Sequence, residues 1–317
     1  MMITLKIRFF VNDLQQACMS FGNTKSGLAA IGSLVLFLAY PPRSAAQINS
    51  TVYEDFTQTI LCPYLINPSS TDSSYRFKAR FNNINELGLV RNVSRFYLDA
   101  DKRLGGREEQ EGYHFAGIQV TSAKIGDYIS RSRLQLRYSW MGRISRRASV
   151  SSGISLGFIN YAFLTTQGGT GGSDFGPDGS IGVHYLRRSF SVGLAVQQIF
   201  RPVLIPVHQS FRLNRLYNLD ISKKVDLSPH VDLVSQLVLQ AADMDAYSYG
   251  INVLASFFDV GLIGVSNYHI RKTSFSLGAR DIVLFNSTLL LMVSYSIYHH
   301  EITVSDNHIE VYLAIQK

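Results

Sequence analysis

Arg133-Leu134-Gln135-Leu136-Arg137-Tyr138-Ser139-Trp140 carries the pattern from which the fold class follows. The even positions are large and apolar, whereas the odd positions hold arginine, glutamine and serine. Successive side chains of a β-strand point to opposite faces, so this stretch has one apolar face and one polar face. The same alternation returns in 190–197, 274–280 and 308–315, and more loosely in 231–240 and 289–298. A period of two predicts strands, not helices.

The second face of these segments distinguishes between β architectures. It is small or polar and carries charge in mid-strand. Strands of about 10 residues with one apolar and one polar face are typical of a transmembrane barrel with a wet interior. Strands of a soluble sandwich average about 5–6 residues. We therefore predict an all-β fold, a transmembrane antiparallel barrel of about 14 strands (alternatively 12), near 74–84, 92–101, 112–124, 128–141, 147–160, 177–187, 190–199, 211–223, 230–242, 246–257, 260–269, 273–283, 286–298 and 308–317.

The connections between these segments give a check on strand parity. If the first strand runs outward, the short turns at 187–189, 258–259 and 284–286 all fall on the periplasmic side. The long segments 161–176, 200–210 and 299–307 then fall outside. Short periplasmic turns and long outer loops are the pattern of bacterial barrels. The long stretch 102–111, on the predicted inner side, is the exception.

Composition supports a chain with two kinds of surface. Hydrophobic residues make up 46%, charged residues only 17%, and there are 17 Tyr and 19 Phe. Average soluble proteins have roughly 25% charged residues. The net charge of +7 is mild and scattered, so we expect no nucleic acid as a partner. The longest uncharged apolar stretch after residue 46, around 287–297, is too short for a membrane-spanning helix.

The N-terminal region has the features of an export signal. Lys25 is followed by a run of apolar and small residues over 26–39, which is shorter than a spanning helix and typical of a signal-peptide core. Small residues then precede a predicted cleavage between Ala46 and Gln47. We expect residues 1–46 to be a signal peptide, of which 1–18 are a mis-assigned start ahead of Met19. Residues 47–70 are then a periplasmic lead-in segment, and 71–317 the outer-membrane barrel.

No motif for catalysis, metal or cofactor binding stands out. The sequence has no CxxC, HExxH or GxSxG pattern, and its eight histidines are dispersed. The glycine-rich stretch 165–180 lacks the GK[ST] of a phosphate-binding loop. We predict no cofactor, no metal and no enzyme. An acyl-transfer enzyme would need a serine in contact with a histidine. A contact of Ser151 or Ser191 with His184 across neighbouring strands would provide this, and it stays open as an alternative.

Three motifs, taken in order, resemble the PorP/SprF family of Bacteroidetes outer-membrane proteins. The first is Thr57-Gln58 followed by Asn67-Pro68. The second is Pro177-Asp178 followed by Gly182, at what the sequence predicts to be a strand start. The third is the strand 190–199, with Gly193 and Gln197. Proline at 68 favours a turn because it keeps Asn67 out of the helical region, and the glycines leave room inside a barrel.

The resemblance implies a non-enzymatic component of the type IX secretion or gliding apparatus in the outer membrane. Its partners would be membrane lipid, other secretion components and secreted cargo, whose secretion or surface anchoring it would support. Under this reading, segments 161–176, 200–210 and 47–70 are the first candidates for partner binding.

A channel or transporter for small solutes is the alternative function. Arg133, Arg137, Arg280 and Glu310 lie on predicted inward faces. The arginines form either a cationic constriction in an open pore or a set of paired residues in a plugged barrel.

Overall fold

The structure is a computed structural model, and it describes residues 57–87, 93–105, 112–163, 171–207, 210–242, 246–268, 272–299 and 307–317. The expected signal peptide, the cleavage site at Ala46–Gln47 and the first part of the expected lead-in segment lie outside these residues.

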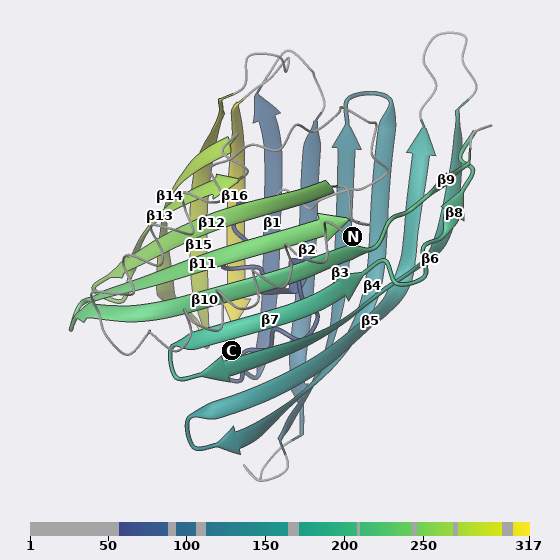
Figure 1. Cartoon of the computed structure of the whole chain (residues 1–317). Coiled ribbons are helices and arrows are strands. Elements are labelled where there is room, and N and C mark those ends of the chain that lie inside the picture. The colour runs from purple at the N-terminus through teal and green to yellow at the C-terminus, as the bar shows by residue number, and fades with distance from the viewer. Residues whose placement is uncertain are drawn as a thin grey trace, which may run out of the picture. The chain divides into compact units, whose positions relative to one another are not determined.

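Fourteen antiparallel strands form a closed barrel (Figure 1). Each strand pairs with its neighbours in the chain, except that β7 pairs with β10, and the first strand closes the ring against the last. The barrel strands are β1 (Phe77–Leu87), β2 (Ser94–Leu104), β3 (Tyr113–Ile125), β4 (Ile129–Ser145), β5 (Ala148–Phe163), β6 (Gly172–Arg187), β7 (Phe190–Gln197), β10 (Leu216–Ser228), β11 (Val231–Ala242), β12 (Ala246–Phe257), β13 (Gly261–Tyr268), β14 (Lys272–Leu284), β15 (Ser287–Tyr298) and β16 (Asn307–Gln316). The predicted all-β barrel of 14 strands is confirmed.

The wall has the two faces that the alternation predicts. In β4, Leu134 and Leu136 are 47% and 65% exposed on the outer face, whereas Arg133 and Gln135, which alternate with them, are both 3% exposed. β16 repeats the pattern, with Ile309 outside and Glu310 fully buried. The apolar side chains therefore face outward around the barrel, and the polar ones face the lumen.

The two ends of the barrel differ in their connections. Short turns join β4 to β5, β6 to β7, β10 to β11 and β14 to β15 at the end where β1 begins and β16 finishes. We call this the terminal end. At the opposite end, residues 198–215 form a long connection that contains a small hairpin, β8 (Val203–Leu204) with β9 (Phe211–Arg212). The loop-length pattern of bacterial barrels predicts that the terminal end faces the periplasm.

β6 departs from the prediction in its starting point. It begins at Gly172 instead of near residue 177, and its first residues pair with β5 alone, because β7 pairs with β6 only from Ser180 onward. Pro177 consequently lies inside the strand, opposite Phe158 on β5. A proline is tolerated there because the other edge of β6 has no ladder partner at that level.

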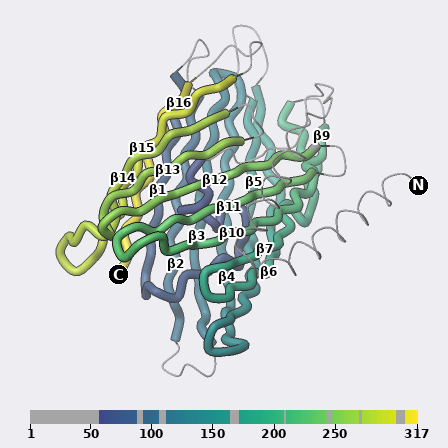
Figure 2. Tube along the Cα trace, turned by 60° about the vertical axis from the view of Figure 1, so that its left-hand side comes forward, coloured from purple at the N-terminus to yellow at the C-terminus, as the bar shows by residue number. Residues whose placement is uncertain are grey.

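The segment before β1 also departs from the prediction. The sequence places residues 47–70 on the periplasmic side, but residues 57–70, with a short 3-10 helix η1 (Pro63–Leu65), lie within the ring of strands (Figures 1 and 2). The reason is that the segment's polar groups match those of the inward wall, as detailed below. We call residues 57–70 the plug.

Candidate functional site

The plug begins on a buried carboxylate of the wall. Glu310 of β16 accepts hydrogen bonds from the backbone N–H groups of Thr57 (2.9 Å) and Gln58 (3.1 Å), and from the Thr57 hydroxyl. Asn82 of β1 donates a further bond of 2.6 Å to the same carboxylate. A buried carboxyl group needs hydrogen-bond partners, and here the plug supplies most of them.

The next side chains of the plug reach strands on the other side of β16. The Gln58 amide donates to Ser276 (2.9 Å) and to Ser294. The Thr59 hydroxyl lies 2.8 Å from the Tyr268 hydroxyl and accepts a 2.8 Å bond from Asn252. These partners belong to β12, β13, β14 and β15, so two plug residues connect four strands.

An apolar island lies in the middle of the polar lumen. It joins buried plug residues to inward-facing apolar residues of the wall, and buries them together. Its members are Cys62, Leu65 and Ile66 of the plug with Ile84, Tyr97, Val238, Leu262, Met292, Tyr312 and Ala314. Burial of apolar surface here adds the non-directional part of the plug's stabilisation.

Tyr64 is enclosed by charged groups of the wall. The guanidinium carbons of Arg137 and Arg80 lie 3.4 Å and 4.4 Å from its ring centroid. Both arginines pair with Asp99 and Asp101 of β2; the Arg80–Asp101 distance is 2.7 Å and the Arg137–Asp99 distance is 3.0 Å. Each guanidinium group is therefore paired with carboxylates and at the same time makes a cation–π contact with the Tyr64 ring.

The plug turns at Asn67, which lies against two glycines of the wall. Its side-chain oxygen accepts from the Ser69 N–H (3.0 Å), and its amide donates to the Val183 carbonyl (3.1 Å). A Cβ at Gly182 would collide with the Asn67 side chain, and a Cβ at Gly193 would lie 2.6 Å from its amide nitrogen. The two glycines therefore leave the space that the turn occupies.

The carbonyl groups around this turn are also bonded to the wall. Gln197 of β7 donates to the Leu65 carbonyl at 2.6 Å, and Asn218 of β10 donates to the Ile66 carbonyl at 3.0 Å. The Ser151 hydroxyl of β5 donates to the Ser69 carbonyl at 2.6 Å. The backbone of the plug thus finds in the wall the hydrogen-bond partners that a buried chain requires.

The motif residues singled out from the resemblance mostly meet in this one interface. Thr57, Gln58, Asn67 and Pro68 belong to the plug, and Gly182, Gly193 and Gln197 belong to the wall that contacts it. Pro68 packs close to the backbone of β5, since a Cβ at Gly153 would lie 2.6 Å from its carbonyl carbon. Pro177 and Asp178 lie apart from the plug: Asp178 pairs with Arg133 at 2.7 Å and accepts from Gln135 at 2.9 Å.

The three predicted lumen arginines do not form one cationic ring. Arg133 and Arg137 are buried, and each pairs with an aspartate: Arg133 with Asp178 and Arg137 with Asp99. Arg280 lies at the terminal end, where it bonds the carbonyl of Asp259 at 3.2 Å and lies within 3.8 Å of Asp232. Sequence reasoning missed Arg80, Asp99 and Asp101, although the alternation in β2 would have placed its two aspartates on the inward face.

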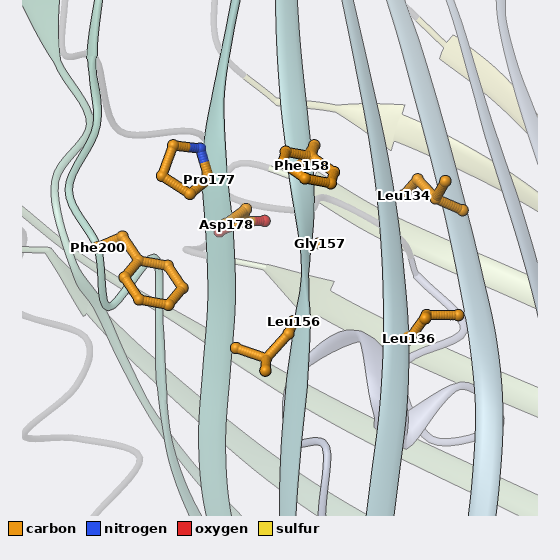
Figure 3. A pocket seen from close by; sticks show the side chains of 8 residues that line it. All are labelled: Leu134, Leu136, Leu156, Gly157, Phe158, Pro177, Asp178 and Phe200. Atoms are coloured by element: carbon orange, nitrogen blue, oxygen red, sulfur yellow. The ribbon is translucent and has the colours of Figure 1, made fainter.

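On the outside of the barrel, a shallow groove of about 360 Å³ interrupts the apolar band (Figure 3). It is lined by Leu134, Leu136, Leu156, Gly157, Phe158, Pro177, Asp178 and Phe200. It lies where β7 has ended and Phe200 packs beside Gly179 of β6. Its apolar side chains lie on the outer face of the barrel, together with the other outward-facing apolar residues.

The described part of the chain gives no geometry for catalysis or metal binding. The Ser151 hydroxyl contacts the backbone carbonyls of Ser69 and His184 and not the imidazole, and Ser191 contacts Ser222. No group of three or more His, Cys, Asp or Glu in the described residues is placed to hold a metal ion. Within the same residues, no helix has the length and apolar character to cross a membrane.

These features define an outer-membrane β-barrel whose lumen is occupied by its own N-terminal segment. Solved structures with the same fold are similar at low sequence identity. The toluene transporter TbuX of Ralstonia pickettii matches with a TM-score of 0.53 and 11% identity over 82% of this chain and 92% of its own. A TodX mutant, a monoaromatic hydrocarbon channel, matches with a TM-score of 0.54 and 9% identity over 85% and 96% of the two chains.

The family is established by a match over most of the sequence. Residues 46–314 match the family described as type IX secretion system membrane protein PorP/SprF, and the chain belongs to this family. No match is found among curated proteins. Its location in the outer membrane follows from the family and the barrel fold together.

Proposed function

We propose that this protein is a closed barrel that serves the type IX secretion apparatus as a scaffold, and that it supports secretion or surface anchoring of cargo without conducting solutes. The observation that carries the proposal is the plug. Its polar groups bond to strands around the ring, from β5 and β7 to β16, and its apolar residues pack against inward-facing apolar residues of the wall. A barrel with a filled lumen offers its ends and its outer surface to partners, and not its interior.

The segments available to partners change accordingly. Residues 57–70 are buried and cannot serve as the periplasmic binding segment expected from the sequence. The connection 198–215 remains a candidate: Val203 and Ile205 are more than half exposed at the end opposite the terminal end. We propose this connection as a contact for cargo or for an outer component of the apparatus.

Deletion of residues 201–209 tests this part of the proposal in the native cell. Surface display of cargo should fall, while heat-modifiability on gels should show a folded barrel in the outer membrane. Shortening the β14–β15 turn at the other end is the matched control and should leave display unchanged. Normal display after the deletion would contradict the role proposed for this connection.

A channel for small apolar solutes is the second candidate. Two observations favour it: the outward groove beside Phe200, and the similarity of the fold to a toluene transporter and a monoaromatic hydrocarbon channel. The two proposals separate in planar bilayers and in uptake assays with liposomes. A steady conductance or hydrocarbon uptake by the wild-type barrel would favour the channel over the closed scaffold.

A further inference from the structure

Four exposed arginines lie together at the terminal end of the barrel. Arg146 and Arg147 form the β4–β5 turn, and Arg187 and Arg188 lie at the β6–β7 turn. The two turns are neighbours, because Ala148 is paired with Arg187 and the Arg188 N–H donates to the Arg147 carbonyl at 3.0 Å. We call these four residues the arginine patch; in Figure 1 the two turns lie at the lower end of the barrel.

The charge of the patch is not balanced within the described part of the chain. None of the four guanidinium groups has an ion pair there, and neither 128–173 nor 179–219 contains an aspartate or glutamate. On the other side of the same rim, cations do have carboxylates: Lys224 lies 2.7 Å from Asp232, and Arg280 contacts three aspartates. Among the residues that the structure describes, the rim therefore has paired cations at β10, β11 and β14 and four unpaired arginines at the β4–β5 and β6–β7 turns.

We propose that the arginine patch is the docking site for an acidic, carboxylate-rich surface of a periplasmic protein. Clustered like charges repel one another, and a partner of opposite charge relieves that repulsion on binding. Arginine suits this role because its planar guanidinium binds carboxylates with two parallel hydrogen bonds. Ile144, next to the patch, is 68% exposed and adds an apolar contact of the kind found with arginine in protein interfaces.

The position of the turns favours protein over lipid as the partner. Trp140, on the outer face of β4, is an aromatic residue of the type that marks the membrane boundary. Arg146 lies six residues farther along the chain, which at about 3.3 Å per residue and a tilt near 40° is roughly 15 Å beyond it. The headgroup layer of one leaflet is only about 5–7 Å thick. The β4–β5 turn with Arg146 and Arg147 therefore extends past the headgroups.

Photo-crosslinking in the native cell tests the proposal directly. A benzophenone amino acid at Ile144 should capture a periplasmic protein with an acidic surface. Capture should fall at least tenfold in the variant R146E/R147E/R187E/R188E, and it should return when the contacted carboxylates of the partner are changed to lysine. K124E/R212E, a double charge reversal at the opposite end, is the control for position and should crosslink like the wild type. Heat-modifiability shows that each variant is folded.

Two results would overturn the proposal. Capture in the quadruple variant at the wild-type level would show that the arginines do not form the contact. The second result concerns lipid. If the quadruple variant captured protein as the wild type does, but had lost affinity for phosphatidylglycerol nanodiscs relative to phosphatidylcholine nanodiscs, the patch would be assigned to anionic lipid. The proposal rests on the scaffold function but fails separately from it: if cargo display needs the barrel but not the arginine patch, the scaffold stands and the docking site does not.

Discussion

Removal of the Glu310 carboxylate is the sharpest test of the plug. In Glu310→Ala, the N–H groups of Thr57 and Gln58, the Thr57 hydroxyl and the Asn82 amide all lose their acceptor. An unsatisfied buried donor costs about 1–3 kcal/mol, and water entering the vacated space recovers part of this. Taking about 1 kcal/mol for each donor, the docked state of the plug should lose about 3–4 kcal/mol.

The plug carries its own reporter of this loss. Cys62 is fully buried in the docked state, so a maleimide reacts with it only when the plug opens. In a Cys18→Ser background, the labelling rate of Glu310→Ala should rise by roughly 100- to 1000-fold, since about 1.4 kcal/mol corresponds to a factor of ten. Glu86→Gln removes a wall carboxylate that pairs with Arg95 and should label like the parent. A folded Glu310→Ala barrel whose Cys62 stayed as protected as in the parent would refute the reasoning.

Three further outcomes are expected. Gly193→Val should expose Cys62 from the other end of the plug, because its side chain occupies space held by the Asp220 carboxylate and the Asn67 amide, whereas Gly261→Ala, whose nearest neighbouring atom is 3.7 Å away, should not. In urea unfolding of the refolded barrel, a double-mutant cycle of Tyr64→Leu with Arg137→Met should give a coupling of about 1–2 kcal/mol, and additivity would show that the stacked pair contributes nothing. In planar bilayers the wild-type barrel should be silent and Glu310→Ala should show brief openings, so equal conductance of the two would argue against the plug as the barrier.

The barrel wall could be predicted from the sequence because it depends on local alternation. The predicted segments correspond to the fourteen barrel strands with small differences at their ends, and Leu134 and Leu136 face outward as expected. β6 is the largest difference. Its glycines at 172 and 176 read as loop residues, but in the structure they allow Pro206 and Pro202 of the long connection to pack closely against the strand.

The plug could not be predicted in the same way. Residues 57–70 have no period of two or 3.6, and their place depends on partners more than a hundred residues away, such as Glu310 and Gln197. The resemblance marked Thr57, Gln58, Asn67 and Gly193 without giving their roles. In the structure Gly182 and Gly193 both leave room for the Asn67 side chain, and Gly193 also leaves room for the Asp220 carboxylate.

The composition of this interface determines how firmly the plug is held. Most of its bonds join uncharged amides and hydroxyls, and each contributes only about 0.5–1.5 kcal/mol net because water competes for the same groups. Water offers no substitute for the apolar contacts of the island around Cys62, Leu65 and Ile66. The Glu310 carboxylate, which the wall already buries, depends on the plug for three of its four hydrogen-bond donors. The polar contacts thus fix where the plug lies, while these two features hold it there. A change in either should open the lumen, whereas loss of a single peripheral bond, such as that of Ser151, should leave it closed.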